Sequence, residues 1–296
     1  MNRTRVDLEK QTQRVAVCVF SGFCSGVERA IRLAEGFLLE RPGRALYVTG
    51  DIVHNTGVMQ RLTSLGLKRI AGDAFPVDQT VLVQAHGISP VAEEALVKSR
   101  NQIINGTCPI LRRNFNRFCR AEKQGFRFIL FGDPTHPEVE AIQGLLNDVI
   151  VFRNLEELSE VSNQVLAAEK IALIAQSTKS VGAYKQSAKM LIERLKPRQL
   201  FQMHFSICDV TILREEEIKE RAPLFSVVFV VGGKHSANTE KLVLLAKERC
   251  QKVFWVESVE EAKTCLPSIS DTDSILIGGG TSTPLQDIKA IEALFL

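Results

Sequence analysis

Three cysteines stand far apart in the sequence, and their types and spacing could serve metal chemistry. Cys24 lies in Gly-Phe-Cys-Ser-Gly, Cys108 in Gly-Thr-Cys-Pro-Ile and Cys208 in Ser-Ile-Cys-Asp-Val-Thr, at intervals of 84 and 100 residues. Such wide and similar spacing predicts that three structural units each contribute one thiolate to a shared centre. An iron-sulfur cluster with three protein ligands keeps one iron open, and a substrate can bind and react at an open metal position. The spacing therefore points to catalysis.

Two other interpretations of these cysteines remain open on the residues alone. They could be buried and inert, because free cysteine often behaves as a small apolar residue. They could also bind zinc, although structural zinc sites usually contain closely spaced cysteine pairs. The other four cysteines, Cys18, Cys119, Cys250 and Cys265, fall in strand or helix patterns and are interpreted as packing residues. An odd number of scattered cysteines does not resemble a secreted disulfide framework.

The elements that must position these residues follow one recurring pattern. A short apolar run is followed by a polar turn with Gly or Ser and then by a segment with helical spacing. Continuous apolar runs between amphipathic helices are typical of parallel strands buried on both faces, so the sequence predicts an α/β fold. The predicted strands are 15–20, 45–48, 81–83, 128–131, 171–175, 226–231 and 274–277. The predicted helices are 26–40, 91–98, 108–124, 139–146, 155–161, 183–195, 239–249, 259–266 and 284–294.

The length of 296 residues exceeds the usual size of one hydrophobic core, so several small units are expected. The cysteine intervals fit three βαβ units. We predict a first α/β unit at 25–107, a second at 108–207 and a third at 208–296, which the N-terminal strand segment 14–24 joins.

Composition excludes several classes of partner. The net charge is +3 and no run of five like charges occurs, which argues against nucleic acid or a membrane surface as a partner. The longest strongly apolar run, 224–233, is about half of what a bilayer span needs. Residues 1–14 are polar and of mixed charge, without the apolar core of a signal peptide. These features predict a cytoplasmic protein.

The polar turns are the places to look for a site, because ligands of open parallel sheets bind outside the carboxyl ends of the strands. Four of the five histidines, His54, His86, His136 and His235, fall in turns that follow predicted strands. A single such histidine is more often a capping or buried structural residue. Their joint placement favours a binding site at one edge of the sheets.

Six short motifs, taken in their order along the chain, can be compared with the motifs of known families. They are Gly22-Phe-Cys-Ser-Gly-Val-Glu-Arg-Ala-Ile31, Asp51-Ile-Val-His-Asn55, Ala85-His-Gly87, Thr107-Cys-Pro109, His136-Pro-Glu-Val-Glu140 and Ile207-Cys208. Together they closely resemble the 4-hydroxy-3-methylbut-2-enyl diphosphate reductase family of the methylerythritol phosphate pathway of isoprene biosynthesis. The resemblance covers nearly the whole chain from Val15 onward.

The resemblance implies a trefoil of three small parallel-sheet α/β units around a central 4Fe-4S cluster. The matching ligands are Cys24, Cys108 and Cys208, with one iron open. The implied reaction is reductive dehydroxylation of 4-hydroxy-3-methylbut-2-enyl diphosphate to isopentenyl and dimethylallyl diphosphate at that iron. Ferredoxin or flavodoxin would donate the electrons.

The resemblance also implies roles for the polar residues of the turns. A diphosphate needs several converging hydrogen-bond donors, and helix N-termini add backbone amides. The implied substrate-binding residues are His54, His86, His136, Ser177, Thr178, Ser236, Asn238 and Ser282. The implied catalytic residues are Glu138, Ser177 and His136, with Glu138 relaying the proton that converts the hydroxyl into water. An isolated glutamate at this position would be interpreted only as a carboxylate that the helix dipole stabilises.

Several positions depart from the pattern of the family. Ala237 replaces a serine, Ser177 replaces a threonine, and Asn105 and Gly106 replace an acidic and a small residue. Beyond the third cysteine, the residues at the family positions are Asp209, Val210, Thr211, Arg214 and Glu215. A carboxylate at Asp209 would repel an anionic substrate unless it turns outward. Two alternatives therefore stay open: a paralogous iron-sulfur reductase with a different oxygenated substrate, and a non-catalytic redox sensor that carries a cluster.

Overall fold

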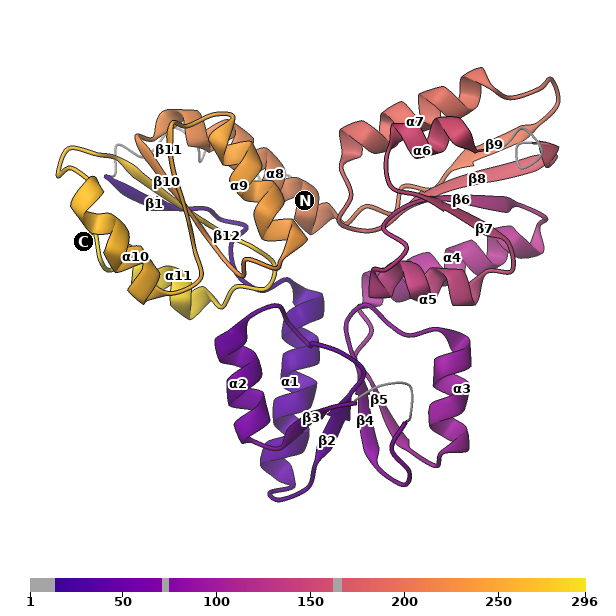
Figure 1. Ribbon diagram of the computed structural model, residues 1–296, viewed down its shortest axis with the longest axis horizontal. Helices are drawn as coiled ribbons and strands as arrows, with labels where there is room; N and C mark the ends of the chain where they lie inside the picture. The colour runs from indigo at the N-terminus through magenta and orange to yellow at the C-terminus, as the bar shows by residue number, and fades with distance from the viewer. Residues whose placement is uncertain (1–13, 71–74, 162–166) are drawn as a thin grey trace. The chain divides into compact units, whose positions relative to one another are not determined.

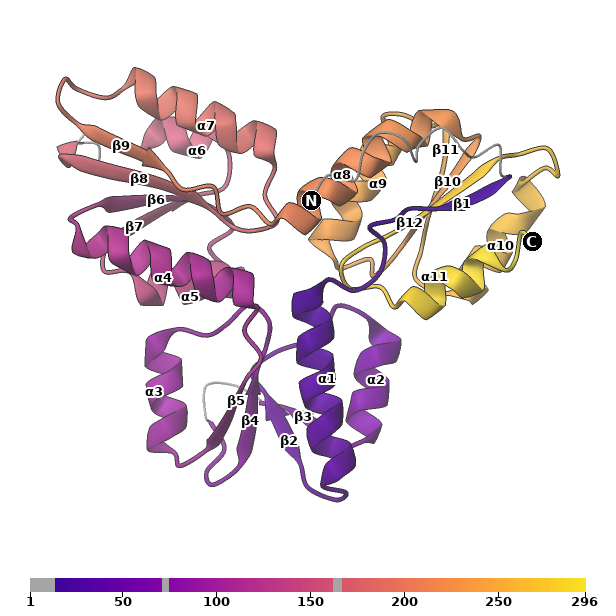
Figure 2. The same ribbon diagram turned by 180° about the vertical axis from the view of Figure 1, so that it is seen from behind.

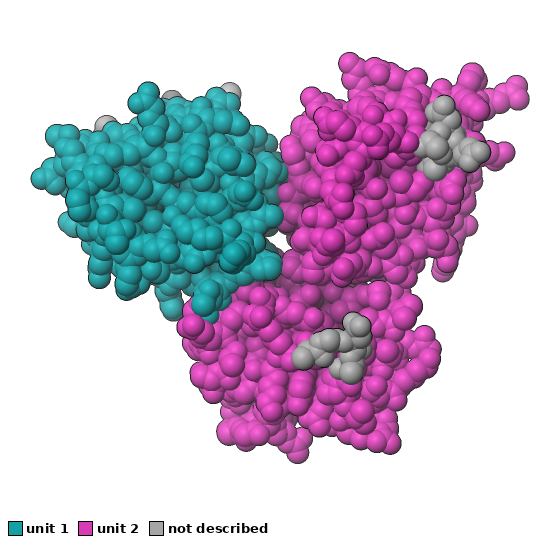
Figure 3. Space-filling view, in the orientation of Figure 1, with its two compact units in different colours: residues 1–24, 54–56, 210–296 teal, residues 25–53, 57–209 magenta. Residues whose placement is uncertain are grey.

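The computed structural model describes residues 14–70, 75–161 and 167–296 of the chain. They divide into two compact units (Figure 3). Unit 1 comprises the described residues of 1–24, 54–56 and 210–296, and unit 2 comprises those of 25–53 and 57–209. The boundaries of the three units predicted above, 25–107, 108–207 and 208–296, stay a prediction.

Unit 1 contains one four-stranded parallel sheet. Its strand order is β1 (Val15–Val17), β12 (Ile275–Gly279), β10 (Val227–Val231) and β11 (Lys252–Val256). Val15 and Val227 both pair with Ile275, so β1 and β10 lie on either side of β12. All five residues of β10 are buried, as expected for a central strand that is covered on both faces.

Four helices cover the two faces of this sheet (Figures 1 and 2). They are α8 (Asp209–Arg221), α9 (Ala237–Lys247), α10 (Val259–Cys265) and α11 (Leu285–Glu292). Ile218 of α8 and Leu242 of α9 pack in one core cluster, whereas Ala262 of α10 and Ile288 of α11 pack in the other. Two short 3-10 helices follow, η3 (Ala222–Leu224) after α8 and η4 (Leu266–Ser268) after α10.

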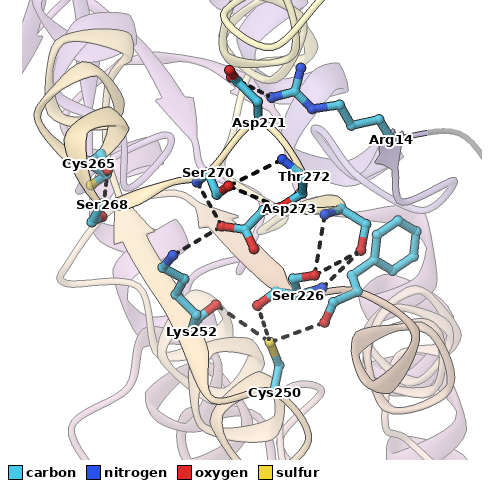
Figure 4. A network of polar contacts seen from close by, with 12 residues as sticks. Arg14, Ser226, Cys250, Lys252, Cys265, Ser268, Ser270, Asp271, Thr272 and Asp273 are labelled. Carbon is cyan, nitrogen blue, oxygen red and sulfur yellow. Dashed lines mark hydrogen bonds and ion pairs between the residues drawn. The ribbon is translucent and has the colours of Figure 1, made fainter.

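A polar network fixes the amino ends of these strands (Figure 4). The Ser226 amide donates to the Ser274 hydroxyl at 3.0 Å. The Asp273 carboxylate accepts from the Ser270 amide at 2.9 Å and from Lys252 Nζ at 3.1 Å. These contacts join the starts of β10, β11 and β12, which leaves the opposite, carboxyl edge of the sheet for the loops with the predicted site residues.

Unit 2 contains two four-stranded parallel sheets. The first has the order β3 (Leu67–Arg69), β2 (Leu46–Val48), β4 (Thr80–Val83) and β5 (Gln102–Asn105). The second has the order β7 (Val149–Phe152), β6 (Arg127–Phe131), β8 (Lys170–Ala175) and β9 (Leu200–Met203). In each sheet the two central strands carry most of the buried apolar residues.

Helices lie on both faces of each of these sheets (Figure 1). Beside the first sheet, α1 (Ser25–Glu40) and α2 (Thr56–Ser64) lie on one face and α3 (Pro90–Lys98) on the other. Beside the second, α4 (Pro109–Lys123) and α5 (Pro137–Leu145) lie on one face, with α6 (Leu155–Glu160) and α7 (Val181–Glu193) on the other. Proline begins α3, α4 and α5, where its fixed backbone angle suits the first helical turn.

The predicted α/β class with parallel sheets is confirmed, and so is a strand in each of the seven predicted ranges. The sequence interpretation missed strands β3, β5, β7, β9 and β11. All five lie at sheet edges. The strands β3, β5 and β9 are mixed in polarity, so no continuous apolar run marks them. The strands β7 and β11 do contain apolar runs, and the sequence interpretation overlooked them. It also missed α2 and α8. No helix in the described parts of the chain is both long enough and apolar enough to cross a membrane.

Candidate active site

The predicted metal ligands share one local structure: each directly precedes an α-helix. Cys24 is followed by α1, Cys108 by α4 and Cys208 by α8. All three are partly exposed, whereas Cys18 and Cys250 are buried and burial raises the pKa of the Cys18 thiol. The seven cysteines, all within described parts of the chain, form no disulfide bonds. A helix N-terminus favours negative charge, so these positions suit anionic metal ligands.

Backbone hydrogen bonds hold the two cysteines of unit 2 at the ends of strands. The Cys108 amide donates to the Ala85 carbonyl at 2.9 Å, directly before His86. The Cys208 amide donates to the Ser177 carbonyl, also at 2.9 Å. The loops after β4 and β8 therefore fix Cys108 and Cys208, so each cysteine lies beside a predicted substrate-binding residue.

Gly26 of α1 leaves the space that the thiol of Cys108 occupies. A Cβ atom at Gly26 would lie 2.9 Å from Cys108 Sγ, closer than side-chain atoms normally approach. Gly26 is buried and is the second residue after Cys24 in the chain. The Gly-Phe-Cys-Ser-Gly motif therefore combines a cysteine with a glycine that makes room for a second cysteine.

Glu138 is the most strongly perturbed carboxyl group beside these loops. It lies in the first turn of α5 and is 1% exposed. Its carboxylate oxygens accept from the Ser177 amide at 2.8 Å and from the Ser177 hydroxyl at 2.6 Å. Burial raises the pKa of Glu138 to about 7, and the two hydrogen bonds from Ser177 oppose this effect. A carboxyl group with a pKa near neutrality can both donate and accept a proton at physiological pH.

His136 begins the same helix as its N-cap. Its Nδ1 accepts from the Glu138 amide at 3.1 Å, which leaves Nε2 as the nitrogen that can carry the proton. The ring of His86 lies edge-on to that of His136, with the ring centroids 5.1 Å apart. The two histidines come from the loops after β4 and β6, so the structure brings together residues from both sheets of unit 2.

Gln176, which the sequence interpretation did not assign to the site, supports Thr178. Gln176 is 4% exposed, and its Nε2 donates to the Thr178 hydroxyl at 2.9 Å. Its Oε1 accepts from the Asp133 amide at 3.0 Å, in the loop before His136. One buried side chain therefore links the loops after β6 and β8. The signal available in the sequence was a glutamine directly after an apolar strand.

Two of the predicted residues of unit 1, Ser236 and Ser282, lie in the loops after β10 and β12. Ser236 is 3% exposed and caps α9, where its hydroxyl accepts from the Thr239 amide at 3.3 Å. Ser282 is 6% exposed in the loop after β12. The Cys24 amide donates to the Thr281 carbonyl at 3.3 Å, one residue before Ser282. Cys24 is therefore tied to the loop that carries a predicted substrate-binding serine.

Asn238 is buried without a hydrogen-bond partner. It is 6% exposed, and neither Oδ1 nor Nδ2 has a partner within the described ranges of the chain. Buried polar atoms are nearly always paired, so these two atoms are available to bind a ligand or a water molecule. Near it, a Cβ atom at Gly233 would lie 2.5 Å from the His54 carbonyl oxygen, which shows that the His54 loop packs closely on the loop before α9.

Three of the departures from the family pattern are exposed, namely Asp209, Ala237 and Asn105, whereas Ser177, Gly106, Thr211, Arg214 and Glu215 are buried. Asp209 is exposed at the first position of α8, where the helix dipole favours a carboxylate. Ala237 is exposed at the start of α9. Glu215 is buried and forms an ion pair with the partly exposed Lys241 of α9.

The predicted site residues belong to two units. Unit 1 contains Cys24, His54, Ser236, Asn238 and Ser282, and unit 2 contains Cys108, Cys208, His86, His136, Glu138, Ser177 and Thr178. Over the ranges that the structure describes, no three His, Cys, Asp or Glu side chains are gathered as a preformed site for a metal ion. The shared centre of three cysteines therefore stays a prediction.

Comparison with known proteins gives a consistent result. The family model described as LytB protein matches residues 15–295. The 4-hydroxy-3-methylbut-2-enyl diphosphate reductase of Aquifex aeolicus is 32% identical over 94% of each chain, and that of Thermotoga maritima is 34% identical, also over 94% of each chain.

Two solved structures share the fold. One is a (E)-4-hydroxy-3-methyl-but-2-enyl diphosphate reductase, described as the terminal enzyme of the non-mevalonate pathway, with a TM-score of 0.73 and 31% identity over 94% of this chain and 97% of that one. The other is the E-1-hydroxy-2-methyl-but-2-enyl-4-diphosphate reductase from Plasmodium falciparum, with a TM-score of 0.82 at 24% identity over 95% of this chain and 87% of that one. The chain therefore belongs to the LytB protein family and is an oxidoreductase enzyme.

Proposed function

We propose that the protein reduces 4-hydroxy-3-methylbut-2-enyl diphosphate to isopentenyl and dimethylallyl diphosphate. In this reaction the allylic C–O bond breaks, two electrons and two protons are consumed, and water leaves. The observation that carries the proposal is the buried Glu138 carboxyl, which has a pKa of about 7 and contacts Ser177, the residue that also holds Cys208. A reductive loss of hydroxide needs a proton donor beside the reacting oxygen, and Glu138 has the required chemistry.

The residues fit a 4Fe-4S cluster with Cys24, Cys108 and Cys208 as its ligands. The fit rests on three partly exposed thiols that each precede a helix, and on Gly26, which leaves the space at Cys108 Sγ. Thiolates are the usual ligands of such clusters. When bound, a cluster with one open iron supplies electrons and a Lewis-acid position for the hydroxyl oxygen.

Glu138 and Ser177 form the proposed proton relay. The Ser177 hydroxyl donates to Glu138 Oε2, so in this arrangement the hydroxyl proton of the serine points toward the carboxylate. When Glu138 is protonated, it can donate to Ser177, which in turn can donate to the departing oxygen of the substrate. Burial keeps Glu138 protonated to a higher pH than an exposed glutamate, which makes this reversal possible near neutrality.

The diphosphate group is proposed to bind the polar residues of the turns. His86, His136 and Thr178 belong to unit 2, and His54, Ser236, Asn238 and Ser282 belong to unit 1. The unpartnered amide of Asn238 and the Nε2 atom of His136 are the best-defined groups for this task. A diphosphate is satisfied by several hydrogen-bond donors, and the side chains of this set are of the types that can donate. Ferredoxin or flavodoxin is the proposed electron donor.

The test is an anaerobic assay of the reconstituted protein with 4-hydroxy-3-methylbut-2-enyl diphosphate and dithionite-reduced viologen. We expect both five-carbon diphosphates as products, measured by mass spectrometry. The Glu138→Gln variant keeps the size of the side chain but removes its exchangeable carboxyl proton, so it serves as the control. A wild-type protein that contains its cluster and forms no more product than this variant would refute the proposal.

A further inference from the structure

One face of α8 carries three buried charged side chains. Arg214 is 4% exposed, and Glu217 and Arg221 are each 8% exposed. Residues three and seven positions apart lie on one side of a helix, so the three side chains form a single row. Burying charges is costly unless each one is paired, and therefore the partners of this row indicate its purpose.

Glu217 binds the backbone of the loop that leads from β1 to Cys24. Its Oε1 accepts from the Val19 amide at 2.7 Å, and its Oε2 accepts from the Phe20 amide at 2.9 Å. Arg221 Nη1 donates to the Val17 carbonyl at 3.0 Å and to Glu217 Oε1 at 2.9 Å. The two side chains therefore neutralise each other and hold the first part of the loop.

Arg214 binds the second part of the same loop. Its Nη2 donates to the Gly22 carbonyl at 2.5 Å, and its Nη1 donates to the Gly279 carbonyl at the end of β12 at 2.7 Å. Gly22 has a φ of +99°, which favours glycine, and it precedes Cys24 by two residues. The guanidinium group therefore joins the loop of Cys24 to the sheet, a bridge that needs two donors in a fixed plane.

We propose that Arg214, Glu217 and Arg221 are positioning residues that set the place of Cys24 as a metal ligand. The inference rests on the proposed function, in which Cys24 binds the cluster. The same helix begins directly after Cys208 in the sequence, and its side chains hold the loop of Cys24, another proposed ligand. Backbone amides donate to Glu217, and backbone carbonyls accept from Arg214 and Arg221. These bonds fix the loop without using any polar group of Cys24 itself.

Glu215 supplies a matched control on the same helix. It is 7% exposed, similar to Glu217, but its carboxylate pairs with Lys241 of α9 and makes no contact with the loop of Cys24 within the described residues. Glu215→Gln and Glu217→Gln therefore remove the same charge at the same burial. Only the second substitution places an amide group opposite the donating amides of Val19 and Phe20.

The first measurement uses the full-length protein without metal, under reducing conditions, and follows iodoacetamide labelling of individual cysteines by mass spectrometry. Loss of one hydrogen bond to a charged group should accelerate labelling of Cys24 about tenfold in Glu217→Gln and in Arg214→Lys. Labelling of Cys108 in the same molecules should stay unchanged, and Glu215→Gln should resemble the wild type at both cysteines. An equal acceleration at Cys24 and Cys108, or none at Cys24, would overturn the inference.

The second measurement follows iron release to a chelator from the anaerobically reconstituted protein. We expect Glu217→Gln and Arg214→Lys to lose iron about tenfold faster than wild type and Glu215→Gln to lose it at the wild-type rate. A Cys24→Ser variant that keeps all its iron would refute the ligand assignment of the proposed function while the labelling result stands. Unchanged labelling in Glu217→Gln would refute the positioning role even if Cys24→Ser loses its cluster.

Discussion

The buried Glu138 carboxyl should make the stability of unit 2 depend on pH. Burial raises its pKa from the ordinary 4.5 to about 7, so the folded protein binds this proton more tightly than the unfolded chain does. The stabilisation is therefore complete below about pH 4.5 and is lost as the pH rises through about 7. Each pH unit corresponds to 1.36 kcal/mol, so the difference between 4.5 and about 7 amounts to about 3 kcal/mol.

The perturbation that isolates this effect is Glu138→Gln, because glutamine has a similar size and does not titrate. The free energy of unfolding of wild type, relative to that of Glu138→Gln, should fall by about 3 kcal/mol between about pH 4 and pH 8. Glu140→Gln is the control, since Glu140 is exposed on the same helix and its replacement removes the same charge. This control should run parallel to wild type at every pH.

The assay must report on unit 2. The single tryptophan, Trp255, belongs to unit 1, so its fluorescence would follow the wrong unit. Hydrogen exchange measured by mass spectrometry on peptides from β6 and β8 reports the opening free energy next to Glu138. Comparing variants at the same pH cancels the intrinsic pH dependence of exchange. Curves for wild type and Glu138→Gln that stay parallel from acid to neutral pH would refute the assigned burial effect.

Three further predictions concern single side chains. Gly26→Ala should destabilise the protein by about 1–3 kcal/mol and reduce its iron content, because the new methyl group meets the Cys108 thiol at 2.9 Å. Asn238→Ala should weaken binding of inorganic diphosphate about tenfold, measured by calorimetry, without lowering the melting temperature, because the amide makes no hydrogen bond in the described protein. Cys108→Ser should abolish retention of iron and sulfide after anaerobic reconstitution, whereas Cys119→Ser, within α4, should retain both.

Matched variants separate these effects from general damage. Gly36→Ala lies in the same helix as Gly26 but has no atom within 4 Å of its new methyl group, so it should stabilise the helix by about 0.5–1 kcal/mol. Asn154→Ala removes the cap of α6 and should cost about 1 kcal/mol of stability with no change in diphosphate affinity. An Asn238→Ala protein that is less stable and binds diphosphate normally would assign that residue a structural role.

Much of the fold could be predicted from the sequence because central parallel strands are buried on both faces. The run Val227–Val231 is apolar throughout, and Lys170–Ala175 is apolar after its first residue, so both are recognisable without a partner. Edge strands such as Leu67–Arg69 have one exposed side and carry charges, and only pairing with β2 makes them strands. Their existence depends on the neighbouring strand, which local composition does not reveal.

The helix α8 is the most informative failure of the sequence interpretation. Its sequence from Arg214 to Arg221 is dominated by charges, which usually mark a solvent-exposed face. In the structure, Glu217 and Arg221 are buried against the loop before Cys24, while Glu216 and Glu220 are exposed. A charge is identical in the sequence whether it meets water or a backbone amide, so burial of these residues could not be predicted.

The sequence by itself determined the α/β class and the residues that are able to do chemistry. Cysteines and histidines in turns after apolar runs can be recognised without knowing which residues contact one another in the fold. Only the tertiary structure decided that Glu138 is buried against Ser177, that Asn238 is buried without a partner and that α8 holds the loop of Cys24. These properties arise from contacts between residues up to 204 positions apart in the chain. Desolvation and hydrogen bonding depend on such neighbours, and they turn ordinary side chains into candidates for catalysis, binding and positioning.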